Sequence, residues 1–236
     1  MPKAKDSGFK EQTNNERKDK ERERKYKDFN NDGYGAEDKY FDAEVKRWLS
    51  EMDYDDRLAV ETYTGWKYED INPYLREGRY GSGDDPDMER LIDNATRGLN
   101  QFVLSENMHV YRKSDDDLFH DIDVHLGHGA NSVREFVDQI NASKGSVVSD
   151  KGFTSTSTRS STWSGRVHFE IMVPKGTKCA YVDSISRNHG ERELLLNRGT
   201  NFKIVSAHIK KGEGFWSSDT PVVVLQVVKP SGRKKS

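Results

Sequence analysis

The sequence has little of several residue types and patterns, and each scarcity excludes a class of protein. Its 236 residues include one cysteine, Cys179, which rules out an internal disulfide and any cysteine-rich metal site. No run of 18 apolar residues occurs, so the sequence predicts no membrane-spanning helix. Residues 1–5 precede no apolar stretch, and we therefore expect no secretory signal peptide. The 38 basic and 40 acidic side chains give a net charge of −2, which makes no general case for nucleic-acid binding.

Apolar residues are also scarce, at 33% of the chain, and they are scarcest at the N-terminus. Residues 1–30 carry 10 basic and 7 acidic side chains and contain no Ile, Leu or Val. Such a segment buries too little apolar surface to offset the entropy of ordering it. We therefore predict a charged, disordered segment over 1–35, one domain over 36–230 and a basic tail over 231–236. Because residues 16–27 mix both charges at helical spacings, a helix formed on a docking or delivery partner is the alternative.

The pattern of apolar residues predicts the fold class. Helical spacing dominates before residue 105, in the sets Phe41, Val45, Trp48, Leu49, Met52 and Met88, Leu91, Ile92, Ala95, Leu99, Phe102. Short strand-like segments dominate afterwards, at 108–112, 166–173, 180–182, 193–196, 203–209 and 222–228, with one helix near 133–140. Helices followed by strands favour an α+β fold, in which N-terminal helices pack on a mixed, mostly antiparallel pair of sheets. No Gly-x-Gly-x-x-Gly follows a strand, and there is no Walker loop.

Two short segments carry polar residues that a plain strand does not need. Arg112 ends the apolar segment 110–112, where its rigid donor fork can face a phosphate; the alternative is a surface arginine that closes a strand. In residues 152–157, alternation places the Phe153 ring and the Ser155 hydroxyl on one strand face, together with Ser157. This face can line a polar cleft, or it can belong to an edge strand rich in Ser and Thr.

Two further segments stand out by their charge and their aromatic content. If residues 191–193 are extended, Glu191 and Glu193 share one face with their Cα atoms roughly 6.5–7 Å apart. Like charges at that separation raise one another's pKa, which general-base or electrostatic work would explain. A solvated strand end is the alternative. Residues 63–76 gather four aromatic side chains in a helix-turn region, as a stacking surface or as packing.

The order of these segments resembles a known enzyme family. An aromatic-Arg pair, then Phe-x-Ser-Thr-Ser, then Glu-x-Glu leading into Leu-Leu-x-x-Gly, is similar to the signature of arginine-specific mono-ADP-ribosyltransferases. The upstream Tyr-Thr-Gly-x-x-Tyr-x-x-Ile-Asn-x-Tyr-Leu-Arg resembles the helical motif of ADP-ribosylating exotoxins. The likeness is greatest to the catalytic component of clostridial-type binary toxins, and it covers roughly residues 40–230. It implies the ADP-ribosyltransferase fold, NAD+ as substrate and a toxin or effector role.

The resemblance also implies roles for individual residues. Arg112 would bind the pyrophosphate of NAD+, and Ser155 would hold the catalytic carboxylate of Glu193 beside the nicotinamide ribose. Glu191 would address an arginine of the target protein. A glutamine at that place is usual in relatives that modify asparagine or cysteine. The remaining NAD-binding residues would be Thr156, Ser157, Tyr68 and Asn72. The loop 158–164 would cover the nicotinamide.

These residue types fit the chemistry without a metal. Nicotinamide leaves as a neutral group, so the reaction needs a carboxylate near the ribose, where positive charge develops, and not a general acid. The protonated acceptor arginine needs a negative group that holds it and a base that takes its proton. His120, His125 and His128 lie close in sequence, but their loose spacing favours solvated loop residues over a zinc site.

Some features depart from the family pattern, and alternatives remain open. The aromatic residue that binary toxins usually carry three places before the first glutamate is Asn188 here, which puts actin in doubt as the target. Without a signal peptide, we expect phage delivery, export by a specialised system or action inside the producing cell, with activity in the cytoplasm of the target cell. An NAD glycohydrolase and a non-catalytic binding module on the same fold are the rival functions. Hydrolysis would depend less on Glu191 than transfer does.

Overall fold

The computed structural model describes residues 25–115, 117–129, 131–212 and 218–228. In that part of the chain the helical elements are α2 (Ala36–Glu51), α3 (Tyr54–Thr62), the π-helix η1 (Tyr63–Lys67), α4 (Tyr68–Arg76), α5 (Pro86–Gln101), the 3-10 helix η2 (Asp117–Ile122) and α6 (Ser132–Ala142). The strands are β1 (Met108–Ser114), β2 (Val147–Asp150), β3 (Thr154–Ser157), β4 (Val167–Val173), β5 (Cys179–Tyr181), β6 (Glu193–Leu196), β7 (Thr200–Lys210) and β8 (Thr220–Val228). The predicted α+β class, with helices before strands, is confirmed.

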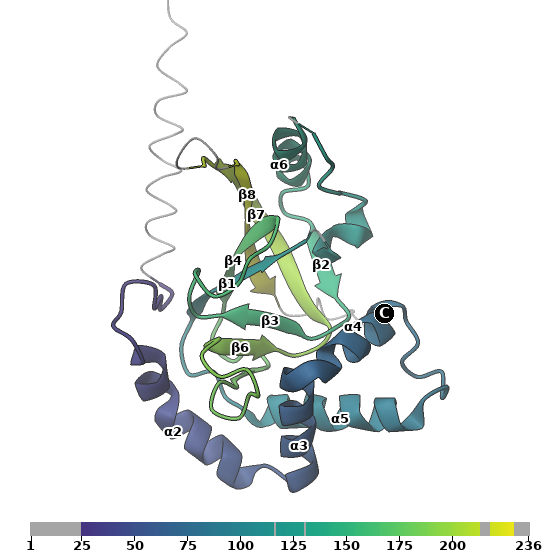
Figure 1. The fold of residues 1–236 in the computed structure, drawn as a ribbon, viewed down its shortest axis with the longest axis vertical. Coiled ribbons are helices and arrows are strands. Elements are labelled where there is room, and N and C mark those ends of the chain that lie inside the picture. The colour runs from purple at the N-terminus through teal and green to yellow at the C-terminus, as the bar shows by residue number, and fades with distance from the viewer. Residues whose placement is uncertain (1–24, 116, 130, 213–217, 229–236) are drawn as a thin grey trace, which may run out of the picture.

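Helices α2, α3, α4 and α5 gather in the lower half of Figure 1, beside β3 and β6. Most residues of the predicted apolar faces of α2 and α5 are buried there. At the start of α5, Pro86 is the first helical residue, and the Asp85 side chain accepts a hydrogen bond from the Met88 amide at 3.0 Å. The buried Trp48 of α2 donates from Nε1 to the Gly98 carbonyl of α5 at 2.7 Å. A Cβ atom at Gly98 would lie 3.1 Å from both Met52 Sδ and Val60 Cγ2, so the glycine lets α5 pack closely on α3 and on the residue after α2. None of the described helices combines the length and apolar character needed to cross a membrane.

The eight strands of the described chain form one mixed sheet in the order β2-β7-β8-β4-β1-β3-β6-β5. Within this sheet, β4 and β8 are parallel and the other neighbours are antiparallel. β1 and β3 share a single residue pair, Tyr111 with Ser157. We call this narrow junction the seam. The prediction of two sheets therefore corresponds to two halves, which the seam joins into one sheet.

The predicted boundary of the N-terminal segment at residue 35 is wrong for residues 25–35. Lys27 forms a parallel bridge with Met108 at the start of β1, and the Phe29 side chain is 1% exposed. The Phe29 ring packs on Tyr40 and Phe41, with centroid distances of 5.3 and 6.2 Å. A short stretch with one large aromatic residue can join a core even where its neighbours are charged. Residues 1–24 and the predicted tail 231–236 lie outside the described residues.

We expect the Phe29→Ala variant to lose about 3–5 kcal/mol of unfolding free energy, because the substitution leaves a cavity in the aromatic cluster. Thermal unfolding measures this loss as a lower Tm. The matched control is Tyr54→Ala, whose aromatic side chain is 76% exposed and should change Tm little. Equal melting temperatures for the two variants would mean that residues 25–35 do not contribute to the core.

Candidate active site

A cavity of about 510 Å³ brings together most of the residues singled out in the sequence. Its lining comes from η1, α4, β1, β3, the loop after β3 and the segment before β6. The lining residues are Tyr63, Thr64, Tyr68, Glu69, Asn72, Pro73, Arg76, Arg112, Lys113, Ser155, Trp163, Ser164, Asn188, Glu191 and Glu193. The cavity lies at the seam, because Arg112 is on β1 while Ser155 is on β3.

Arg112 links the two halves of the sheet. Its Nη1 donates to the Ser155 carbonyl oxygen at 3.0 Å, and its Nη2 donates to the Ser114 hydroxyl at 3.2 Å. These bonds fix the plane of the guanidinium group, which presents its donors in a rigid fork. The charge of Arg112 also acts on the Glu193 carboxylate across the cavity.

Glu193 is buried, with 3% of its surface exposed, and it begins β6 opposite Ser157 of β3. Burial raises the pKa of Glu193 to about 7, because a carboxylate loses its hydration in the core. Hydrogen bonding with the Ser155 side chain and the charge of Arg112 oppose this rise, whereas the Glu191 and Asp183 carboxylates add to it. The carboxyl group of Glu193 therefore titrates near neutral pH.

Tyr63 is a residue of this site that sequence reasoning did not single out. Its ring is buried and packs on Phe153 at a centroid distance of 4.9 Å. Its hydroxyl accepts a hydrogen bond from Asn72 Nδ2 at 3.0 Å. Burial, followed by the charge of Glu193, raises the pKa of Tyr63, so the phenol stays protonated at neutral pH. The sequence does contain a pattern that points to this residue, because Tyr63 is the first residue of the Tyr-Thr-Gly motif in the helical segment.

The turn that carries the two glutamates is not extended as predicted. Arg192, between them, has φ of +50°, a left-handed conformation that is rare for residues other than glycine. The Asp183 carboxylate fastens this turn, since it accepts from the Arg192 amide at 2.7 Å and from the Gly190 amide at 3.1 Å. Glu191 and Glu193 nevertheless both line the cavity.

Thr156 and Ser157, predicted to bind NAD+, do not line the cavity and instead hold neighbouring segments. The buried Thr156 hydroxyl donates to the Leu194 carbonyl. The Ser157 hydroxyl donates to the Glu191 carbonyl at 2.8 Å and lies 2.7 Å from the Thr162 hydroxyl. Of the four hydroxyl residues in β3, Ser155 alone lines the cavity. Thr156 and Ser157 therefore support the walls of the cavity, and their binding of NAD+ stays a prediction.

The helical wall of the cavity is held by side chains of other segments. Asn72 accepts from the Phe153 amide at 3.0 Å while it donates to Tyr63, so it ties α4 to the start of β3. A Cβ atom at Gly152 would lie 2.7 Å from Asn72 Oδ1, so this close contact needs glycine. The Tyr68 side chain is 40% exposed and lines the cavity near its mouth.

The departure from the family pattern at Asn188 has a structural role. Asn188 Nδ2 donates to the Thr64 carbonyl of η1 at 3.1 Å. A Cβ atom at Gly65 would lie 2.8 Å from Arg187 Cδ, so Arg187 packs directly on the π-helix. π-helical turns are frequent at functional sites. These contacts close the cavity between the helical wall and the loop before the glutamates.

The loop 158–164, predicted to cover the nicotinamide, divides into two parts. Trp163 and Ser164 line the cavity, as that prediction requires. Arg159 instead pairs with the buried carboxylate of Glu37 at the start of α2. Its remaining donors bind the carbonyl oxygens of Asp32 and Gly33 at 3.0 and 2.9 Å.

The described residues contain no group of three or more His, Cys, Asp or Glu side chains that could hold a metal ion. Of the three histidines considered above, His125 lies 3.5 Å from the exposed carboxylate of Asp123. The His120 side chain lies outside the described residues. The sulfur of Cys179 is buried, and burial raises its thiol pKa.

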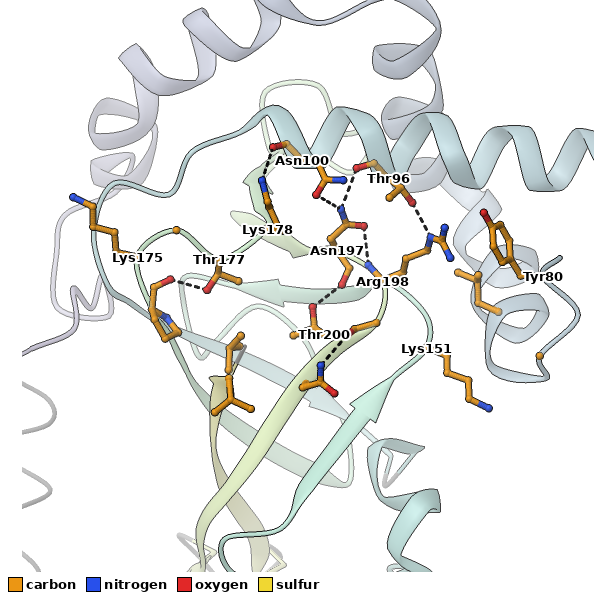
Figure 2. Close-up of a pocket in the computed structure, with 18 residues that line it drawn as sticks. Tyr80, Thr96, Asn100, Lys151, Lys175, Thr177, Lys178, Asn197, Arg198 and Thr200 are labelled. Carbon is orange, nitrogen blue, oxygen red and sulfur yellow. Dashed lines mark hydrogen bonds between the residues drawn. The ribbon is translucent and has the colours of Figure 1, made fainter. Parts of the chain in front are cut away.

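A second cavity, of about 990 Å³, lies between α5 and the turn that joins β6 to β7. Figure 2 shows Lys151 and Lys175 on opposite sides of it, and Lys178 bound to the Asn100 carbonyl at 3.3 Å. It shares no lining residue with the smaller cavity, and its described lining includes no carboxylate, imidazole or thiol group. The smaller cavity is therefore the better candidate for chemistry, because it holds a buried carboxylate that titrates near neutral pH.

Comparison with solved structures extends the likeness beyond single motifs. Plx2a, an ADP-ribosyltransferase toxin from Paenibacillus larvae, superposes with a TM-score of 0.75 at 29% identity, over 86% of this chain and 99% of that one. The ADP-ribosylating toxin BECa, from a binary enterotoxin of C. perfringens, shares the fold with a TM-score of 0.73 at 21% identity, over 86% of this chain and 50% of that one. BECa was solved with NADH.

Comparison by sequence points the same way. The NAD(+)–arginine ADP-ribosyltransferase EFV of Enterococcus faecalis is 25% identical over 173 residues, which are 73% of this chain and 33% of that protein. The chain spans between a fifth and two fifths of the length of the curated relatives it matches. The sequence model of the ADP-ribosyltransferase exoenzyme family matches residues 37–228, which include every residue that lines the candidate site. The resemblance predicted from ordered motifs is thus confirmed, and the chain belongs to the ADP-ribosyltransferase exoenzyme family.

Proposed function

We propose that the chain transfers ADP-ribose from NAD+ to an arginine of a target protein and releases nicotinamide. The observation that carries this proposal is the buried Glu193 carboxylate, which faces Ser155 and Arg112 in a cavity that it shares with Glu191. Membership of the exoenzyme family supports NAD+ as the substrate. The name of the Enterococcus relative supports arginine as the acceptor.

Each of these residues has a role in the proposed reaction. Arg112 binds the pyrophosphate with the guanidinium that its bonds to Ser155 and Ser114 hold in place. Ser155 orients Glu193. The ionised carboxylate of Glu193 stabilises the positive charge that develops on the ribose. Tyr68 and Asn72 border the substrate on the helical side, with Asn72 also holding Tyr63.

The chemistry balances without a metal. The bond from the ribose C1 to the nicotinamide nitrogen breaks, and its electron pair leaves with the neutral nicotinamide. A guanidino nitrogen of the acceptor arginine forms the new bond to C1, and one guanidinium proton passes to a base. Glu191 holds the guanidinium and takes that proton, because it is the second carboxylate in the cavity.

The role of the protein follows from this activity. We infer that it acts as a toxin or effector on a protein of a target cell, in the cytoplasm where NAD+ is available. The segment before residue 25 is a candidate docking or delivery element, on the strength of its mixed charge alone. The polar residue Asn188, bound to η1, stands where binary toxins usually carry an aromatic side chain, which favours a target other than actin.

Nicotinamide release from NAD+, with and without the guanidine acceptor agmatine, tests the proposed function. We expect wild type to modify agmatine, Glu193→Gln to lose at least 100-fold in both transfer and hydrolysis, and Glu191→Gln to keep hydrolysis while losing transfer. Mass spectrometry of agmatine measures transfer directly. The matched control is Glu69→Gln, which removes a cavity-lining carboxylate without a proposed role.

Other outcomes of that assay assign the rival functions. A rate of nicotinamide release that changes neither on addition of agmatine nor in Glu191→Gln would identify an NAD glycohydrolase. Binding of NAD+ by wild type without any turnover, in the presence of agmatine, would identify a binding module.

We expect kcat/KM for NAD+ to rise about tenfold per pH unit below pH 7 and to level off above it. The reason is that the ionised carboxylate is active, while burial raises the pKa of Glu193 to about 7. In Glu191→Gln the midpoint of the hydrolysis profile should move to lower pH, because the neighbouring negative charge is gone. A flat wild-type profile from pH 5.5 to 8 would contradict this assignment.

The same burial makes a prediction about stability. The folded protein binds the Glu193 proton more tightly than the unfolded chain, whose carboxyl has a pKa near 4.5. The stability contribution of this proton is therefore fully present below pH 4.5 and is lost as the pH rises to about 7. We expect Glu193→Gln to be more stable than wild type by on the order of 1–3 kcal/mol at pH 8 and nearly equal at pH 5. Thermal unfolding at both pH values measures this, and an equal difference at the two would refute it.

A further inference from the structure

Glu37 is a buried carboxylate that does not line the candidate active site. It lies in the first turn of α2 with no exposed surface. Burial raises its pKa, but the hydrogen bond from Arg159, its own backbone amide and the charges of Arg159 and Arg192 hold that pKa below its usual value. An ionised carboxylate at the N-terminus of a helix, next to two guanidinium groups, is a strong fixed charge.

Arg159 connects Glu37 to the loop after β3. Besides the ion pair with Glu37, Arg159 binds the carbonyl oxygens of Asp32 and Gly33. The next amide, that of Ser160, donates to the Asn30 side chain at 2.9 Å. The loop that contributes Trp163 to the cavity is therefore tied to the segment before α2. Figure 1 shows this purple segment on the side of the molecule where β3 ends and β6 begins.

Arg192 connects the same carboxylate to the turn that carries the glutamates. Its Nε lies 3.5 Å from Glu37 Oε1, and its Nη1 donates to the Gly190 carbonyl at 2.8 Å. On the outer side, the ring of Tyr34 covers the guanidinium at 4.7 Å. The Arg192 side chain thus lies between Tyr34 and Glu37, both contributed by the N-terminal side of α2.

The backbone of Arg192 explains why such an anchor matters. Its left-handed conformation costs energy for a side chain other than glycine, and surrounding contacts must hold it. The carbonyl of Arg192 accepts from the Thr158 amide at 3.1 Å, and its amide donates to Asp183. Glu193 is secured within the β6 ladder, whereas Glu191 lies outside it, just before the strained residue.

We propose that Glu37 is a positioning residue that holds Arg192, and through it Glu191, in the geometry needed for transfer to the acceptor arginine. This proposal rests on the proposed function. It extends the site to α2, which contributes no side chain to the cavity. Since Glu193 has its own support in the sheet, the loss of Glu37 should affect transfer more than hydrolysis.

The test compares Glu37→Gln with wild type in two independent measurements. Agmatine transfer should fall at least tenfold, with the loss in kcat and not in the KM for NAD+, while NAD+ hydrolysis falls less than threefold. Hydrogen exchange, followed by mass spectrometry, should be at least threefold faster in the peptide 188–194 and unchanged in the β4 peptide 167–173. Asp42→Asn is the control, because it removes an exposed carboxylate of α2 that pairs with Lys46.

A second variant keeps the test valid if Glu37→Gln does not fold. Arg192→Gln keeps a residue other than glycine at the left-handed backbone position, and it removes the side-chain contact with Glu37. It should reproduce the selective loss of transfer, and in the double variant the two losses should not add. Equal losses of transfer and hydrolysis in the folded single variants, or additive losses in the double variant, would overturn the proposal.

The exchange measurement separates this proposal from the proposed function. If wild type fails to modify agmatine, the proposed function fails, while faster exchange at 188–194 in Glu37→Gln still supports the anchoring contact. If wild type modifies agmatine but exchange at 188–194 is the same in Glu37→Gln as in wild type, the anchoring contact alone is rejected.

Discussion

The antiparallel pairing of β3 with β6 is the constraint on which the candidate site depends. It sets Ser157 opposite Glu193 and places the Ser155 side chain beside the same carboxylate. No other pair of strands in the described sheet brings a hydroxyl and a buried carboxylate together in this cavity. The helices, the loop after β3 and Arg112 are arranged around this pair, and each of them is held by its own contacts.

Burial of the Glu193 carboxylate has a cost that its neighbours offset only in part. Ser155 and Arg112 favour its ionised form, whereas the Glu191 carboxylate opposes it. A site that needs both carboxylates in one cavity must therefore accept electrostatic repulsion between them. Asp183 adds to the repulsion and yet is needed, because its oxygens satisfy the amides of Gly190 and Arg192 in the turn. The same turn holds the left-handed backbone of Arg192, and backbone strain of this kind is common at functional sites.

The sequence predicted the fold class and the central residues because local patterns determine them. Glu193–Leu196 forms a strand with the predicted bounds, and the predicted apolar set of α5 includes its buried residues Ile92, Ala95 and Leu99. The contacts of Arg159 and Glu37 could not be predicted, since they join positions 122 residues apart and involve charged residues of a kind common in this chain. Phe29 was missed for a related reason: composition averages over a segment, whereas one aromatic ring is enough to order part of it.

The seam between β1 and β3 has fewer paired residues than any other junction of the described sheet. A single residue pair crosses it, and the hydrogen bond from Arg112 to the Ser155 carbonyl adds a side-chain link between the two halves. Arg112 and Glu193 lie on opposite sides of this seam, and both line the cavity. A ligand that contacts both residues would add a further link between the two halves of the sheet, at the junction that has the fewest backbone pairs.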